Sequence, residues 1–222
     1  INAMTGGSET GKNINQKLAK IANECEILLV TGSYSAALKE LDNDSFKVVR
    51  ENNKNLLTET LNLLEKNNRT WEDVTDVFGI DKDFTSGQIA IKELNPIFLQ
   101  IHINLMQELI MPEGSRNFNE WESNLRSFVK NIKVPLILKE VGFGMDNKTI
   151  EKAIKLGIKT VDISGRGGTN FAYIENMRRK NHFEYLNDWG KTTVQALLDA
   201  KKFEEKVEII ASGGGHWVPP VL

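Results

Sequence analysis

One predicted strand of this chain carries a row of polar side chains on a single face. Gln100, His102 and Asn104 alternate with apolar residues, so an extended backbone directs all three to the same side. Polar groups that face a packed interior are costly unless they are paired or used. A lone inward histidine most often belongs to a hydrogen-bonded polar core layer. Three such residues in a row, followed at once by further polar groups, favour a functional site.

Gln107 and Glu108 follow this strand in the sequence. Glu108 supplies the hard carboxylate oxygens that Mg²⁺ accepts, usually alongside water and substrate phosphates rather than in an all-protein cage. A solvated loop acid is the commoner fate of any single glutamate. The polar strand beside it is what makes Glu108 a candidate metal ligand.

Lys139 lies inside an otherwise apolar run, Leu136–Gly142. An amine buried there must meet an anion or an electron-rich acceptor, or lose its proton. Two kinds of partner satisfy this requirement. One is an internal carboxylate, Glu140 or Asp162, and the other is an oxygen of a cofactor or substrate.

Two glycine-rich turns complete the set of candidate site residues. Ser164 and Thr169 offer hydroxyls in the first, whose small neighbours let backbone N–H groups approach a ligand. Gly213 and Gly214 belong to the second, which ends an apolar run as phosphate-binding turns of α/β barrels do. Taken alone, each glycine-rich turn is weak evidence.

The segment from the first glycine-rich turn to about Leu186 is predicted to be an extended loop over the mouth of the fold. It carries the basic run Arg178–Lys180, for which a solvated surface is the commoner explanation. Cys25, His182 and His216 are predicted to be structural or exposed, because nothing around them has ligand spacing.

The elements that position these residues alternate between short apolar runs and helix-period segments, which is typical of βα units with parallel strands. A doubly wound sheet and a (β/α)₈ TIM barrel both bury such strands. Polar residues gather at the carboxyl ends of nearly all the runs, which favours the barrel. The predicted strands are Ile1–Thr5, Leu28–Ser33, Phe98–Asn104, Leu136–Gly142, Thr160–Ser164 and Val207–Ser212.

An atypical segment at 51–83 interrupts this pattern, and either Asn55–Leu57 or Asp76–Ile80 is the third strand. The sequence therefore predicts an incomplete α/β barrel of about six to seven βα units. Between the strands, one helical face is predicted from Ile14, Leu18, Ile21, Ala22 and Cys25, and another from Phe118, Trp121, Leu125, Phe128 and Val129. A further helix carries Ile150, Ala153 and Ile154, with Asp146 as its N-cap.

Composition narrows the classes of function. The 222 residues are 40% hydrophobic and 26% charged, which suits one globular domain spanning residues 1–222. A formal net charge of -2 gives no sequence-wide attraction to nucleic acid or membrane surfaces. One cysteine excludes an intramolecular disulfide, and the cytoplasm is the expected compartment. Both ends read as cut through a larger protein, since neither begins or closes a βα unit.

Several segments together resemble type 2 isopentenyl-diphosphate isomerase. They are long, ungapped and in the family's order, and they cover most of residues 1–50 and 85–214. The segments are INAMTGG at Ile1–Gly7, LQIHINLMQELIMPEG at Leu99–Gly114, KEVGFG at Lys139–Gly144, DISGRGGTN at Asp162–Asn170 and YLNDWG at Tyr185–Gly190.

The resemblance implies an FMN-bound (β/α)₈ barrel that interconverts isopentenyl and dimethylallyl diphosphate, with Mg²⁺ and a flavin kept reduced, commonly by NADPH. It also implies a homo-oligomer in the complete enzyme. By matched motif, the substrate would be contacted by His102, Asn104 and Gln107, and Glu108 would hold Mg²⁺. The flavin-binding residues would be Ala3, Met4, Thr5, Ser33, Lys139, Ser164 and Thr169, with Gly213 and Gly214 as the phosphate turn.

The chain departs from the family in three places. The family's basic N-terminal motif is absent, and its third-strand Asn is replaced by Val77 or Leu61, with Asn62 one residue out of register. After Gly214 the family's Arg-containing turn gives way to a different sequence. Two alternatives therefore accompany the isomerase hypothesis: an FMN-dependent barrel oxidoreductase of the hydroxy-acid oxidase type, and an inactive barrel fragment that holds no flavin.

Overall fold

The structure is a computed structural model that describes residues 1, 7–27, 29–32, 44–52, 74–77, 91, 98–114 and 116–214, with the backbone alone at 74–77. The predicted flavin contacts Ala3, Met4, Thr5 and Ser33 lie outside the described residues, as does most of the atypical segment. The chain forms two compact units. One comprises Ile1–Ile101 with Lys130–Leu136, and the other comprises His102–Val129 with Ile137–Leu222.

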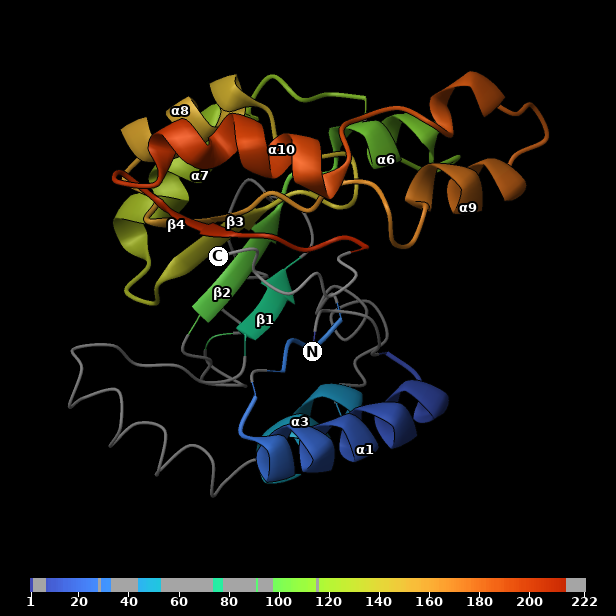
Figure 1. Cartoon of the computed structure of the whole chain (residues 1–222). Helices are drawn as coiled ribbons and strands as arrows, with labels where there is room; N and C mark the ends of the chain where they lie inside the picture. Colours follow the sequence, from blue (N-terminus) through green and yellow to red (C-terminus); the bar gives the residue numbers. More distant parts are fainter. Residues whose placement is uncertain are drawn as a thin grey trace. The chain divides into compact units, whose positions relative to one another are not determined.

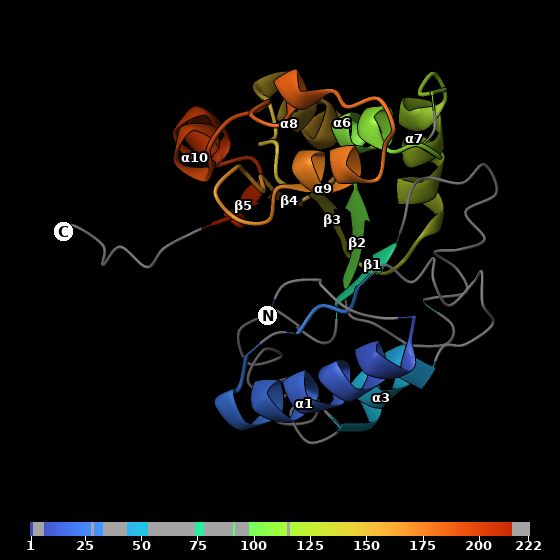
Figure 2. The same ribbon diagram turned by 90° about the vertical axis from the view of Figure 1, so that its right-hand side faces the viewer.

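Helices α1 (Glu9–Cys25) and α3 (Asp44–Asn52) lie side by side in the first unit (Figures 1 and 2). The first helix was predicted correctly, and its buried face was predicted in part, because Ala22 is fully buried and Leu18 packs against the same core. Ile14 and Ile21 are 39% and 46% exposed, whereas the small side chains Ala19 and Ala22 are fully buried. Small residues let the two helix backbones approach closely, and the Asn15 amide donates to the Ser45 carbonyl oxygen at 2.7 Å.

Two parallel strands of the first unit are β1 (Val74–Val77) and β2 (Phe98–His102), with Val74 opposite Phe98. Strand β1 overlaps the second of the two predicted positions for the third strand, Asp76–Ile80. The other, Asn55–Leu57, lies outside the described residues. Every residue of β2 is buried, as expected of a strand covered on both faces.

The second unit contains three parallel strands, β3 (Leu136–Lys139), β4 (Thr160–Asp162) and β5 (Glu208–Ile210). All three were predicted, in each case with longer bounds. Helices α8 (Asn147–Lys155) and α10 (Thr193–Ala200) lie on the same side of these strands (Figures 1 and 2). Asp146 is the N-cap of α8, as predicted, and accepts from the Thr149 N–H at 2.7 Å.

The remaining elements follow the strand ends. They are α6 (Leu105–Ile110), α7 (Trp121–Asn131), α9 (Phe171–Met177) and the 3₁₀ turns η1 (Glu184–Leu186) and η2 (Lys201–Phe203). In α7, Leu125 and Phe128 are buried, as its periodicity predicted. A small core of Ile110, Val141, Phe143 and Ala172 ties α6 and α9 to the turn after β3.

The described residues thus form an α/β arrangement of parallel strands and helices, which confirms the α/β part of the predicted fold class. Closure into a barrel remains a prediction. Within the described part of the chain, no helix has the length and apolar character needed to span a bilayer.

Candidate active site

In the second unit, main-chain hydrogen bonds connect the segments at the carboxyl ends of the strands. The Ile103 N–H donates to the Lys139 carbonyl at 2.8 Å, which fixes the loop after β2 against the end of β3. The Glu140 N–H donates to the Asp162 carbonyl at 3.0 Å, and the Gly165 N–H donates to the Ser212 carbonyl at 3.1 Å. Polar residues from four successive βα loops therefore meet at one edge, where parallel α/β folds build their sites.

Asn104 and Glu108 form a buried polar pair at the start of α6. The Asn104 Nδ2 donates to the Glu108 Oε1 at 3.0 Å, and the two residues are 1% and 5% exposed. Asn104 occupies the N-cap position but makes no side-chain cap bond, so its amide is directed to the carboxylate instead. Its Oδ1 is buried and has no hydrogen-bond partner among the described residues. Glu108 offers carboxylate oxygens of the kind that Mg²⁺ accepts, and the Asn104 carbonyl oxygen, directed away from Glu108, is a second unsatisfied acceptor at the site.

Gln107 pairs with a residue that was absent from the predicted site, Glu175 on α9. The Gln107 Nε2 donates to the Glu175 Oε1 at 3.2 Å, and Glu175 is only 6% exposed. The segment that carries Glu175 was predicted to be an extended loop, and this prediction was wrong, because residues 171–177 form α9. The signal that the sequence offered was the spacing of Glu175 and Ala172, because residues three apart lie on the same face of a helix.

The basic run at the end of α9 is also tied to the protein rather than freely solvated. Arg178 contacts Glu175 and Glu113, and the Arg179 guanidinium donates to the Ile110 carbonyl at 2.6 Å. Arg179 also lies 4.2 Å from the centre of the Phe183 ring. These contacts connect α9 to the carboxyl end of α6.

Lys139 is buried at the end of β3, at 6% exposure, and its ammonium donates to the Glu140 main-chain carbonyl at 3.0 Å. Its charge also lies near the carboxyl groups of Glu140 and Asp162. The expected internal acids are therefore neighbours, while the direct acceptor is a carbonyl. Burial raises the pKa of Asp162, although hydrogen bonds from Ser212 and the charge of Lys139 oppose this shift.

Glu140 folds back over the turn that follows it. Its Oε2 accepts from the Val141 and Phe143 N–H groups, both at 2.7 Å. Burial raises the pKa of Glu140 from 4.5 to about 7, against these two hydrogen bonds and the nearby charges of Lys139 and His102. His102 is itself 6% exposed, so three titratable groups gather at this strand end.

The raised pKa of Glu140 predicts a stability that falls as pH rises. Between pH 4.5 and about 7 the folded state binds the Glu140 proton more tightly than the unfolded chain does. The stabilising contribution is therefore complete below pH 4.5 and is lost by about pH 7, a change on the order of 3 kcal/mol. Glu140→Gln should flatten the dependence of the urea midpoint on pH between 5 and 7, leaving the smaller same-sign contribution of Asp162.

Glu151→Gln is the control for this prediction, because Glu151 is an exposed acid on α8 and loses the same charge. An unchanged pH slope in Glu140→Gln would show that another group carries the titration.

The two glycine-rich turns meet backbone to backbone. A Cβ at Gly213 would lie 2.1 Å from the Gly165 carbonyl oxygen. Among the described residues, the N–H groups of Gly167, Gly168, Gly213 and Gly214 donate to no main-chain acceptor. Adjacent amides of this kind, in turns with positive φ, form anion-binding concavities.

Ser164 and Thr169 occupy different positions in the first turn. Ser164 is 6% exposed and adopts φ 29°, an unusual conformation for a residue with a Cβ. Its carbonyl accepts from the Gly142 and Gly144 N–H groups at 2.9 and 3.0 Å, which joins the turns after β3 and β4. Thr169 is exposed at the outer end of the turn.

These observations define a class of protein: a parallel α/β fold with a polar, partly cationic site at the strand ends and a concavity of backbone amides beside it. No family model matches the chain. It is, however, 53% identical over 214 residues to the isopentenyl-diphosphate delta-isomerase of Streptococcus mutans serotype c, which covers 96% of this chain and 59% of that protein. The corresponding isomerases of Streptococcus gordonii and Streptococcus pyogenes serotype M3 are 52% and 51% identical, again over 96% of this chain.

The comparisons confirm the resemblance predicted from the motifs: almost the whole length of this chain is similar to the isopentenyl-diphosphate delta-isomerases. It spans about 60% of the length of the relatives that it matches.

Proposed function

We propose that this chain carries the flavin- and metal-binding part of an isomerase that converts isopentenyl diphosphate to dimethylallyl diphosphate. The observation that carries the proposal is the buried Asn104–Glu108 pair with its orphaned amide oxygen. A polar group left unsatisfied in a protein interior calls for a ligand. Names of relatives that are about half identical over 96% of the chain support the same activity.

Mg²⁺ fits the first part of this site. Glu108 would hold the ion through its carboxylate, while water and substrate phosphates would supply the other oxygen ligands, and Asn104 would contact the substrate. Within the described residues, no three acidic, His or Cys side chains gather into a fuller protein cage. The bound ion would bring the diphosphate to α6 and neutralise part of its charge, with His102 and Gln107 beside the hydrocarbon end of the substrate.

FMN fits the second part of the site. Lys139 offers a buried ammonium to the electron-rich pyrimidine edge, and Ser164 offers a hydroxyl further along the cofactor. The amides of Gly213 and Gly214, with those of the facing turn, would receive the phosphate. Ala3, Met4, Thr5, Ser33 and Thr169 are assigned to the flavin by the resemblance alone.

The reduced flavin, maintained by NADPH, would supply the proton-transferring group of an isomerisation without net redox change. The residues of this chain would then bind and orient the flavin and the substrate, and shield them from solvent. Lys139 would stabilise negative charge on the flavin, and the Gln107–Glu175 pair would stay hydrogen-bonded at the substrate. A cytoplasmic homo-oligomer is the proposed setting.

The decisive experiment compares FMN with riboflavin, which lacks the phosphate. After incubation and gel filtration, the chain should retain FMN with a protein-shifted visible band, and it should bind riboflavin at least ~10-fold more weakly, since ~1.4 kcal/mol of phosphate binding corresponds to that factor. Retained flavin would justify an isomerase assay with Mg²⁺ and NADPH. Absence of any retained flavin would contradict the cofactor assignment for this chain.

A further inference from the structure

The candidate site contains a buried carboxylate, that of Glu175. The positive charge that balances it belongs to Arg178, which lies outside the site. Glu175 is 6% exposed and contacts Gln107 through one oxygen, Oε1, at 3.2 Å. Its other oxygen, Oε2, accepts from Arg178 Nη1 at 2.5 Å. A buried carboxylate needs such compensation, because desolvation otherwise penalises its charged form.

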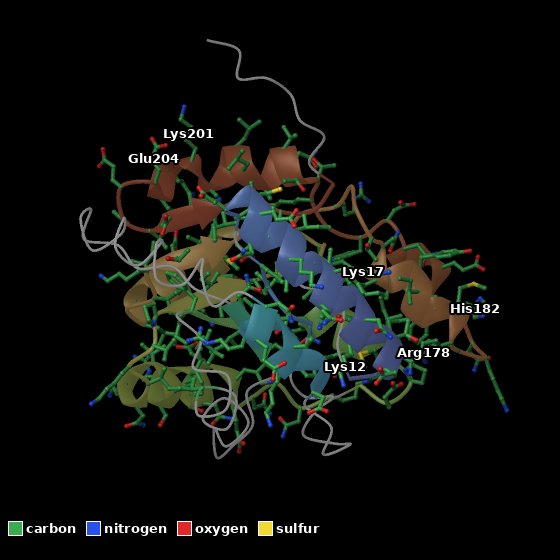
Figure 3. All side chains as sticks on the ribbon, turned by 90° about the horizontal axis from the view of Figure 1, so that it is seen from below. Lys12, Lys17, Arg178, His182, Lys201 and Glu204 are labelled. Atoms are coloured by element: carbon green, nitrogen blue, oxygen red, sulfur yellow. The ribbon has the colours of Figure 1, made fainter. Side chains whose placement is uncertain are left out.

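Arg178 is held in place from its solvent side. Its side chain is 47% exposed, and its second terminal nitrogen, Nη2, contacts Glu113, which lies just after α6. The hydrogen bonds that Arg178 donates to both acids raise its pKa above the ordinary value, so the guanidinium remains charged at any working pH. Arg178, labelled in Figure 3, is the C-cap residue of α9, the helix that lies beside α6 in Figures 1 and 2.

The Glu175 carboxylate determines the orientation of the Gln107 amide. A carboxylate can only accept hydrogen bonds, so it selects the amide rotamer in which the Gln107 NH₂ faces Glu175. The Gln107 carbonyl oxygen is then directed away from Glu175. Without Arg178, the second oxygen of Glu175 loses the contact that holds it, and the carboxylate can rotate away from the Gln107 amide.

We infer that Arg178 is a positioning residue that acts through Glu175 to fix which face of the Gln107 amide the substrate meets. The inference rests on the proposed function, which places Gln107 at the substrate. Arg178 itself reaches neither substrate nor cofactor. The chain Arg178–Glu175–Gln107 connects a surface charge to the candidate site across 71 residues of sequence, from position 107 to position 178.

The test combines the Gln107 side-chain amide signals in NMR with titration of isopentenyl diphosphate and Mg²⁺. The amide signals are identified by their loss in Gln107→Met. In Arg178→Ala, exchange of the Gln107 NH₂ protons should accelerate about 10-fold, and the diphosphate should bind about 10-fold more weakly, while FMN retention stays unchanged. Arg178→Lys keeps the charge, so it should largely restore both the slow exchange of the Gln107 NH₂ protons and the affinity for the diphosphate.

Two controls separate positioning from general structural loss. Lys180→Ala removes the same charge from an exposed neighbour and should change nothing. Glu113→Gln removes only the outer contact of Arg178 and should give a small effect. Equal loss of FMN and substrate, or no rescue by lysine, would overturn the positioning role. So would Gln107 signals that do not change in Arg178→Ala.

Failure of the wild-type chain to bind isopentenyl diphosphate would contradict the proposed function instead. The inference about Arg178 would then be decided by the Gln107 amide exchange alone, which requires no substrate.

Discussion

Glu108→Gln should weaken Mg²⁺ binding in the presence of the diphosphate by about 100-fold or more while FMN remains bound, because the loss of one carboxylate charge near a divalent ion is worth at least ~3 kcal/mol. The substitution conserves volume. The new amide oxygen can still accept from Asn104 Nδ2, as Glu108 Oε1 does at 3.0 Å, so the local fold of α6 is preserved. The change therefore reports on charge rather than on packing.

Calorimetric titration of Mg²⁺ measures this effect, and visible absorption of the retained flavin shows whether the site is intact. Glu120→Gln is the control, because it removes the same charge from an exposed acid outside the site. If Glu108→Gln binds Mg²⁺ as the wild type does, the metal lies elsewhere. If it loses FMN as well, Glu108 has a structural role that the pair with Asn104 does not explain.

Gly213→Ala should destabilise the chain by about 2–5 kcal/mol and prevent FMN retention, since it combines a strained backbone conformation with a steric clash. The φ of Gly213 is +93°, which residues with a Cβ rarely adopt. The added methyl group would also lie 2.1 Å from the Gly165 carbonyl oxygen and 3.0 Å from the Gly165 nitrogen. Main-chain atoms cannot rotate aside, so the two turns must separate, and the concavity formed by their amides opens.

The chain offers a matched control in Gly157. Its φ is +87°, close to that of Gly213, but a Cβ there would meet nothing within 4 Å. Gly157→Ala should therefore cost only the conformational part, about 1 kcal/mol, and should leave FMN bound. Urea unfolding and flavin retention measure both variants. Equal losses in the two would mean that the close approach of the turns contributes nothing.

The sequence by itself determined the elements that depend on local pattern. Short runs rich in apolar residues predicted β2 to β5, in each case with longer bounds than those of the strand that forms. Asp146 was recognisable as an N-cap, since its side chain bonds to an N–H three residues along the chain. The motif segments also predicted the similarity to the isopentenyl-diphosphate delta-isomerases, because long ungapped matches preserve residue type and spacing together.

Strand ends were predicted too long because they are set by the turns that follow. Lys139 ends β3, as Glu140 turns its side chain back to accept from Val141 and Phe143. The alternation of residue types in the sequence does not show that the Glu140 side chain turns back in this way. The same turn decides the partner of Lys139, a carbonyl of the next residue rather than either acid that its residue type suggested.

Only the tertiary structure showed which face of α1 is buried. Periodicity pointed to Ile14, Leu18, Ile21, Ala22 and Cys25. Of these, Ile14, Ile21 and Cys25 are exposed, and the buried face contains Ala22 together with Ala19. Side-chain hydrophobicity predicts that some face is buried, while close helix packing selects small residues at the contact.

The most consequential pairing in the candidate site also required the fold. Gln107 and Glu175 are 68 residues apart, and each is unremarkable in its own segment. Contacts at that separation depend on how α6 and α9 pack, through the core that includes Ile110 and Ala172, and no local pattern encodes them. The sequence thus predicted which residues would carry the chemistry of the candidate site. The fold decided which of them touch, because hydrogen bonds and ion pairs between distant segments exist only once the helices that hold them are packed.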